Sequence, residues 1–223
     1  MIMERLAIGV LTPHVAAGPE VEWPAMAGGR VTVRREPVGP AGPEHALARF
    51  GDGSVGALAY ASTSTGYALG HRAETELIDR LAQRSGVPVV AGAAAAVLAL
   101  RSFRTERVTL VHPPWFDLDL DRLGVGYFHD QGFDATVIRA AGLPGDPSRV
   151  RTTSVIDDLG PRLKDGDDPV FLAGHGFRAA GAIDALERST GRRVLQANQV
   201  VLWAILAAIR PAWTITGYGS LFA

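Results

Sequence analysis

The stretch Val-Gly-Ala-Leu-Ala-Tyr-Ala-Ser-Thr-Ser-Thr-Gly, residues 55–66, changes abruptly from apolar to hydroxyl-bearing side chains. The near-continuous apolar run 55–60 is typical of a strand that is buried on both faces of a parallel sheet. The residues after it enter a helical pattern over 66–85, with Leu77 and Leu81 at helical spacing. The stretch therefore predicts a strand that leads through a polar turn into a helix.

The same alternation continues along the whole chain. We predict strands at 6–11, 31–33, 55–60, 87–91, 108–111, 135–138, 170–172 and 194–195. Helical patterns lie between them, at 43–50, 66–85, 93–102, 117–131, 151–164, 178–190 and 198–209. This order predicts an α/β fold of two similar domains, each with a parallel sheet of about four strands flanked by helices. The predicted domains are 1–103 and 104–205, and we expect the segment 206–223 to pack back on the first domain.

Composition restricts the function. Net charge is −1 and there is no basic run, which argues against nucleic acid as a partner. The longest purely apolar run, Ala93–Leu100, is too short for a bilayer, and no signal-peptide pattern opens the chain, so we expect a cytoplasmic protein that binds no membrane. The chain has no cysteine, which excludes disulfides, zinc–thiolate sites and a thiol nucleophile.

Ligands of open parallel sheets bind at the carboxyl ends of strands, so reactive side chains at those ends are site candidates. The hydroxyls of Ser62–Thr65 lie where a helix begins and favour a carboxylate or other anion, although simple capping of the helix also explains them. His14 follows the first strand, and His112 and Trp115 follow the fifth. After the seventh strand, Gly174 and Gly176 flank His175 and would let ligand and backbone approach closely.

The imidazole of His175 is the strongest candidate for moving a proton near pH 7, and a histidine bonded to a loop carbonyl is the alternative interpretation. A zinc site formed by His14, His112 and His175 is disfavoured, because these residues come from three separate loops without a ligand pair at helical spacing. We therefore predict no metal. Neither a P-loop nor a dinucleotide fingerprint nor a nucleophile elbow is present.

Several short motifs resemble one family. Residues 59–64, Ala-Tyr-Ala-Ser-Thr-Ser, resemble the Ala-Tyr-Ala-Cys-Thr-Ser motif of the maleate isomerase and arylmalonate decarboxylase family, within the Asp/Glu racemase superfamily. Residues 198–203 resemble its late helix motif, residues 217–222 its C-terminal signature, and Pro13 with residues 20–22 its N-terminal motif. The resemblance implies two α/β domains that face each other across the active site, no cofactor, and an assembly of identical chains.

This sequence departs from the family at both cysteines. The first matches Ser62. The second matches Gly174 in an alignment without a gap, or His175 after a one-residue shift, while a family tyrosine corresponds to Trp115. A serine hydroxyl is a far weaker acid than a thiol, so two-thiol racemisation and thiolate addition to maleate are both excluded. The resemblance implies that Thr63 and Ser64 hold a carboxylate and the enediolate derived from it. We also assign Pro13, Trp115, Gly174, Gly176 and Asn198 to substrate binding.

These observations favour an isomerase, racemase or decarboxylase that acts next to the carboxylate of a small mono- or dicarboxylic acid, through an enolate-like intermediate. In this hypothesis His175 moves the proton, Ser62 assists and His14 is a possible helper; His175 would then titrate at about pH 6–7. One alternative is a hydrolase or hydratase in which His175 activates water. The other is a protein that binds carboxylates without catalysis.

Overall fold

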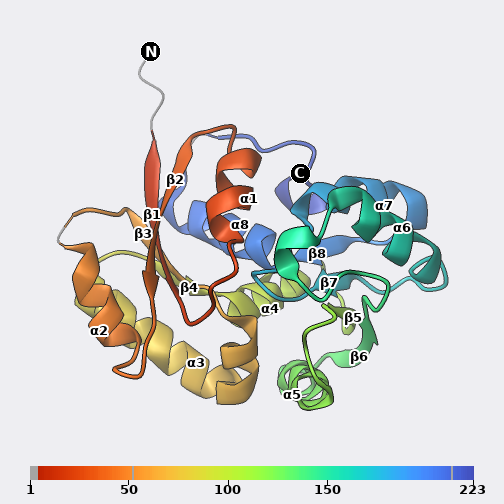
Figure 1. The fold of residues 1–223 in the computed structure, drawn as a ribbon, viewed down its shortest axis with the longest axis horizontal. Coiled ribbons are helices and arrows are strands. Elements are labelled where there is room, and N and C mark those ends of the chain that lie inside the picture. The colour runs from red at the N-terminus through yellow and green to blue at the C-terminus, as the bar shows by residue number, and fades with distance from the viewer. Residues whose placement is uncertain (1–4, 52, 212) are drawn as a thin grey trace.

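The computed structural model describes residues 5–51, 53–211 and 213–223, and it contains two parallel sheets of four strands each (Figure 1). The strand order is β2-β1-β3-β4 in the first sheet and β6-β5-β7-β8 in the second. The strands are β1 (Leu6–Thr12), β2 (Val31–Pro37), β3 (Ala57–Tyr60), β4 (Val89–Ala91), β5 (Arg107–His112), β6 (Asp134–Arg139), β7 (Val170–Leu172) and β8 (Val194–Gln196). All eight predicted strands are therefore confirmed, and the two sheets have the same topology.

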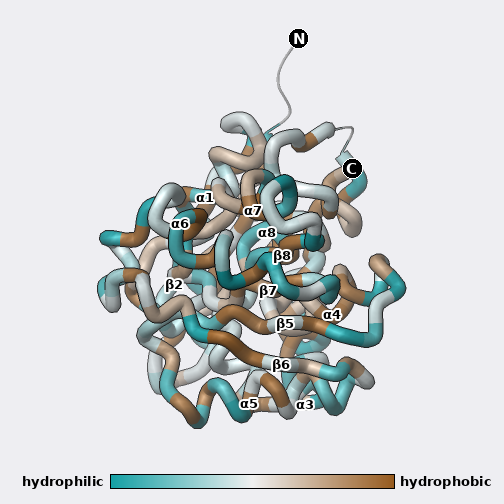
Figure 2. Tube along the Cα trace, turned by 90° about the vertical axis from the view of Figure 1, so that its right-hand side faces the viewer, coloured by the Kyte–Doolittle hydropathy of each residue, from teal (hydrophilic) through white to brown (hydrophobic). Residues whose placement is uncertain are grey.

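Helices follow the strands and cover the sheets. They are α1 (Pro19–Met26), α2 (Pro43–Leu47), α3 (Thr63–Ser85), α4 (Gly92–Ser102), α5 (Leu118–His129), α6 (Thr152–Arg162), α7 (Ile183–Thr190) and α8 (Ala197–Ile209). Single 3₁₀ turns occur at Ala48–Phe50, Pro147–Arg149, Ala180–Ala182 and Ser220–Phe222. Figure 2 shows the apolar segments of β5 and β6 in brown, with helices above and below them. The predicted α/β class with two similar halves is confirmed.

Helix α1 is not among the predicted helices. Pro24 lies inside it, and proline normally interrupts a helix. Pro19 at the first turn fits a helix start, and tertiary contacts hold the remainder. The Trp23 side chain is fully buried, and its Nε1 donates to the carbonyl of Asn198 at 2.8 Å. Packing against the second half of the chain therefore outweighs the poor helix propensity.

The two halves share one core. A single contiguous cluster of buried apolar side chains includes Ile8 and Val97 from the first half and Phe171 and Leu195 from the second. Helix α8 follows the last strand of the second sheet but packs on α4 of the first half. The segment after it contacts both halves, because Arg30 donates to the Thr214 carbonyl and Ser220 N donates to Glu187. The domain boundaries stay a prediction.

Candidate active site between the two sheets

A cavity of about 340 Å³ lies where the carboxyl ends of β1 and β3 meet those of β5 and β7. This is the edge at which ligands of parallel sheets bind. The cavity is lined by Pro13, His14, Val15, Ala16, Thr63, Ser64, Trp115, Phe116, Pro147, Gly174, His175 and Gly176. Its volume suits a small organic molecule.

Four consecutive hydroxyl-bearing residues, which we call the hydroxyl cradle (Ser62–Thr65), lie at one wall, where Thr63 and Ser64 line the cavity and Ser62 and Thr65 lie behind them. Ser62 has extended backbone geometry and caps α3, because its Oγ accepts from the backbone N–H of Thr65 at 3.3 Å. The Ser62 Oγ also lies 2.7 Å from Thr65 Oγ1 and 3.4 Å from Ser64 Oγ. The backbone N–H groups of the first turn add partial positive charge, so the cradle suits a carboxylate.

His14 completes this wall. It follows β1 by two residues, and its Nε2 lies 2.8 Å from Ser62 Oγ and 3.3 Å from Ser64 Oγ. Burial of the ring, and next the guanidinium of Arg35, lower the pKa of His14. The same Arg35 donates to the carbonyl of Val15 at 3.1 Å, which holds the loop that carries His14. The first wall thus contains a histidine–serine pair beside an anion cradle.

His175 reaches the cavity, but its ring nitrogens are directed elsewhere. Its Nδ1 lies 2.7 Å from Asn198 Oδ1. Its Nε2 is buried, and a Cβ at Gly92 would lie 2.3 Å from it, so this nitrogen faces the backbone at the start of α4. Burial lowers the pKa of His175 to about 4, so the ring is neutral at pH 7. This burial argues against the expected titration of His175 at about pH 6–7, which assumed an imidazole in contact with solvent.

Asn198 does not line the cavity, so its predicted contact with substrate is wrong. The residue is fully buried, and its side chain joins the two halves of the molecule. Its Nδ2 donates to Glu22 Oε2 at 2.6 Å and to the His175 carbonyl at 3.0 Å. Because Nδ2 is the donor, Oδ1 must accept the proton of His175 Nδ1, which leaves the lone pair of that ring on Nε2.

Glu22 supports this bridge from α1. Its second oxygen, Oε1, accepts from the backbone N–H of Ala180 at 2.8 Å. Burial raises the pKa of Glu22 to about 7, although both hydrogen bonds and the charge of Arg178 oppose the shift. The loop that carries His175 is therefore fixed from both sides. Position 18 must be glycine, because a Cβ there would lie 1.7 Å from the His175 carbonyl oxygen.

The second wall of the cavity is mainly apolar. Trp115 and Phe116 follow β5, and Pro147 comes from the loop before α6. Gly174 follows β7 with φ +98°, a conformation that favours glycine, and a Cβ there would meet Phe116 and Pro113 at 3.5 Å. No lysine or arginine lines the cavity among the described residues.

His112, the remaining histidine at a strand end, lies outside the cavity. It is fully buried, its Nδ1 lies 2.7 Å from Asp121 Oδ1, and Arg139 donates to the other carboxylate oxygen at 2.6 Å. Within the part of the chain that the structure describes, no three side chains are placed to hold a metal ion. His112 therefore stabilises the second sheet.

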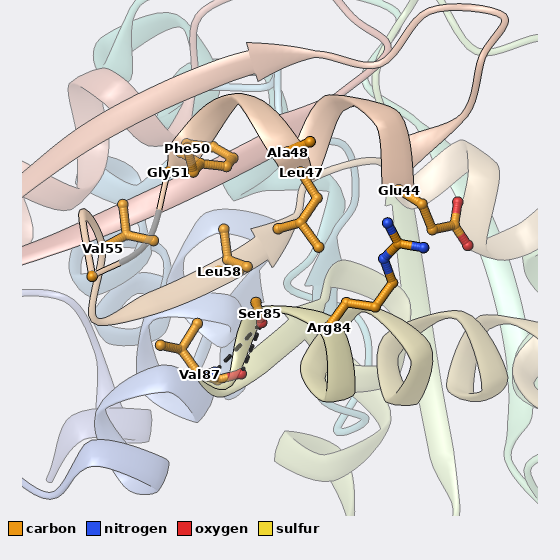
Figure 3. A pocket seen from close by; sticks show the side chains of 11 residues that line it. Glu44, Leu47, Ala48, Phe50, Gly51, Val55, Leu58, Arg84, Ser85 and Val87 are labelled. Carbon is orange, nitrogen blue, oxygen red and sulfur yellow. Dashed lines mark hydrogen bonds between the residues drawn. The ribbon is translucent and has the colours of Figure 1, made fainter.

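Another cavity, of about 350 Å³, lies at the opposite ends of β3 and β4 (Figure 3). Its lining combines apolar side chains, such as Leu47, Val55 and Leu58, with polar and charged ones. Ser85 is the only hydroxyl in this lining, and it hydrogen-bonds to the backbone of Ala82 and Val87. Its two charged lining residues are Glu44, which pairs with Arg80, and Arg84, and no histidine lines it among the described residues, so the cavity at the strand tips is the better candidate.

Most of the predicted site residues come together. Pro13, His14, Thr63, Ser64, Trp115, Gly174, His175 and Gly176 line the cavity, and Ser62 lies directly behind His14. Sequence reasoning missed Val15, Ala16, Phe116 and Pro147, whose apolar side chains carry no chemical signal. It also missed the bridging role of Glu22, although residues 20–22 had been noted as part of a motif.

A model of the arylmalonate decarboxylase family matches residues 44–222. Among solved structures, an arylmalonate decarboxylase superposes with a TM-score of 0.80, at 19% identity over 97% of this chain and 98% of that chain. The Nocardia farcinica maleate cis-trans isomerase bound to TRIS gives 0.83 at 20% identity, over 97% of each chain. The maleate isomerase Iso from Pseudomonas putida S16 gives 0.76 at 20% identity, over 97% of this chain and 98% of that chain.

These structures show a shared fold at low sequence identity. No curated protein matches the sequence. No helix in the described ranges has both the length and the apolar character needed to cross a bilayer. Because the family model covers most of the chain, the protein belongs to the arylmalonate decarboxylase family, a family of decarboxylases and isomerases that act on carboxylates.

Proposed function

We propose that the protein is a cofactor-independent lyase that decarboxylates a small malonate-type acid through an enediolate. The observation that carries this proposal is the contrast between the two walls of the cavity. On one wall, His14 Nε2 lies 2.8 Å from Ser62 Oγ of the hydroxyl cradle. The opposite wall is apolar and is formed by Trp115, Phe116 and Pro147.

The hydroxyl cradle would hold the carboxylate that is retained. Its hydroxyls and the N–H groups of the first turn of α3 donate hydrogen bonds to a charge that grows on the carboxylate oxygens as the enediolate forms. The second carboxylate would then face the apolar wall, where no cation among the described lining residues balances it. A carboxylate without partners in such surroundings is destabilised, and loss of carbon dioxide removes its charge.

The reaction balances without a cofactor. The bond between the central carbon and the departing carboxylate breaks, and its electron pair enters the enediolate. The imidazolium form of His14, which lines the cavity, then gives its Nε2 proton to that carbon and becomes neutral, while Ser62 Oγ orients the ring from behind, and solvent returns a proton to His14. Because His14 is exposed, it can exchange its proton with solvent after each turnover.

Racemisation by two bases is less well supported, because it needs an acid–base group on each face of the carbon. The ring nitrogens of His175 are taken up by Asn198 and buried against Gly92. The same burial weakens the alternative in which His175 activates water for hydrolysis or hydration. A protein that binds carboxylates without catalysis is an outcome of the test below.

The test is proton NMR in deuterated buffer with malonate, methylmalonate and phenylmalonate. We expect loss of carbon dioxide and one deuterium in each product, and a single enantiomer of the deuterated product from methylmalonate, since the proton comes from one wall. Maleate serves as the control and should remain unchanged. Carboxylates that raise the melting temperature without being consumed would instead show a binding protein. Exchange and racemisation of the monoacids would contradict delivery from a single wall.

A further inference from the structure

Helix α3, which begins with the hydroxyl cradle, is not one continuous helix. Gly70 has φ +75° and ψ 159°, so the chain breaks its helical path there. The turns before Gly70 carry Thr63 and Ser64, and the turns after it run on to Ser85. The remainder of α3 therefore does not rigidly fix the place of the cradle, and other contacts must do so.

Glu74 makes the decisive contact behind the cradle. It belongs to the part of α3 after the break, is completely buried, and reaches back to the first turn. A Cβ at Gly66 would lie 2.4 Å from Glu74 Oε1 and 3.1 Å from the Cβ of Ala93, so glycine is needed to admit the carboxyl group. This group therefore lies against the turn whose N–H groups form the cradle.

The opposite half of the molecule holds Glu74 in this place. Tyr127 of α5 donates its hydroxyl proton to Glu74 Oε2, and the same hydroxyl lies 3.0 Å from His71 Nδ1. The ring of Tyr127 packs on that of Tyr67, with centroids 5.7 Å apart. Tyr67 is itself buried and belongs to the part of α3 before the break at Gly70. The cradle of the first half is thus tied to α5 of the second.

We propose that Glu74, held by Tyr127, is a positioning residue that sets the place of the hydroxyl cradle and tunes how tightly the cradle binds a carboxylate. This inference rests on the proposed carboxylate site. A negative charge on Glu74 would repel the bound carboxylate and oppose the partial positive charge of the helix start. A neutral Glu74 would keep the same shape without that repulsion.

Burial raises the pKa of Glu74 to about 7, while the hydrogen bond from Tyr127 and the backbone N–H groups of Ala94 and Ala93 lower it. The charged and titratable groups around it are Tyr60 of β3, Tyr67 and His71 of α3, Arg101 of α4 and Tyr127 of α5. Carboxylate affinity should therefore fall as the pH rises through this range, because Glu74 becomes charged.

The pair His112 and Asp121, with Arg139, packs on the far side of Tyr67. The ring centroids of His112 and Tyr67 are 5.7 Å apart, and Asp121 raises the pKa of Tyr67 as a minor cause after burial and Glu74. These groups reach Glu74 only through Tyr67, so we expect them to contribute little to the pH dependence.

The experiment measures the dissociation constant of malonate by calorimetry at about pH 6, 7 and 8. We expect the wild-type protein to bind about fivefold more weakly at the highest pH than at the lowest. Glu74→Gln, which keeps the shape but stays neutral, should bind malonate equally well throughout. Tyr127→Phe should move the step to higher pH, because it removes a hydrogen bond that lowers the pKa of Glu74. A purely structural role would not move the step in this way.

Two matched variants serve as controls. Glu76→Gln changes an exposed carboxylate two residues away on the same helix and should leave the step in place. Glu22→Gln removes the other carboxyl group that titrates near pH 7 and should also leave it. A step that persists in Glu74→Gln, or disappears in Glu22→Gln, would overturn the proposal. Wild-type protein that binds malonate without a step overturns this proposal alone, whereas failure to bind malonate at any pH overturns the carboxylate site as well.

Discussion

The tips of β3 and β7 occupy equivalent places in two sheets of the same topology, yet they carry opposite chemistry. After β3 the chain enters α3 at once, so Ser62 caps a helix and hydroxyls collect at its positive end. After β7 the chain passes through Gly174, with φ +98°, and a loop before the next helical turn at Ala180–Ala182. The same architecture thus yields an anion cradle in one half and an apolar wall in the other.

Two histidines line the cavity, His14 after β1 and His175 after β7, and their surroundings differ. His14 lies among hydroxyls at the mouth of the cavity, whereas His175 is buried and bonded to Asn198. A reactive imidazole needs access to substrate and solvent, and of the two histidines that line the cavity His14 is exposed and His175 is buried. The contrast between the two tips can be tested by changing one residue at each.

The largest expected effect is on turnover. His14→Gln should lower kcat by about a hundredfold or more, because it removes the proton donor to the substrate carbon. His175→Gln should affect the melting temperature more than kcat. The check is steady-state decarboxylation of phenylmalonate by both variants, with circular dichroism to show that each is folded. A larger loss of kcat in His175→Gln than in His14→Gln would reverse the assignment.

The second expected effect is on stability. Asn198→Ala would leave the buried groups of Glu22 and His175 without a partner, so we expect a loss of about 3 kcal/mol in the free energy of unfolding. Urea denaturation measures this loss, and Gln83→Ala, on the exposed face of α3, is the control that should change little. Equal stability of the two variants would show that the bridge between the halves is energetically unimportant.

The smallest effect should come from the backbone at the tip of β7. Gly174→Ala introduces a Cβ at φ +98° and should lower the free energy of unfolding by about 1–2 kcal/mol. Ser62→Ala at the equivalent tip has ordinary extended geometry and should cost about 1 kcal/mol as a lost helix cap. Thermal unfolding compares the two variants. A Gly174→Ala protein as stable as the wild type would show that the backbone at this tip adapts to a side chain.

The amino-acid sequence was a good guide wherever local pattern decides structure. The apolar run before Ser62 predicted β3, and the hydroxyls after it predicted a helix start, although the helix begins at Thr63 rather than at residue 66. Local pattern did not predict α1, which contains Pro24. This helix is stabilised by Trp23, which is buried between the two halves and donates to the Asn198 carbonyl. Local pattern also misassigned Asn198, because a buried amide that joins two halves has the same local signature as one that contacts substrate.

The sequence by itself determined the α/β class, the eight strands, the hydroxyl cradle and the absence of any thiol, since each follows from residue type and short-range periodicity. Only the tertiary structure decided which histidine of the cavity is exposed and which is buried, because burial and hydrogen-bond partners come from residues far apart in the chain. It brought Glu22 to Asn198 and His175, and Glu74 to Tyr127, across the boundary between the halves. Proton chemistry depends on such long-range surroundings, which displace the pKa values of side chains from those that their sequence neighbours suggest.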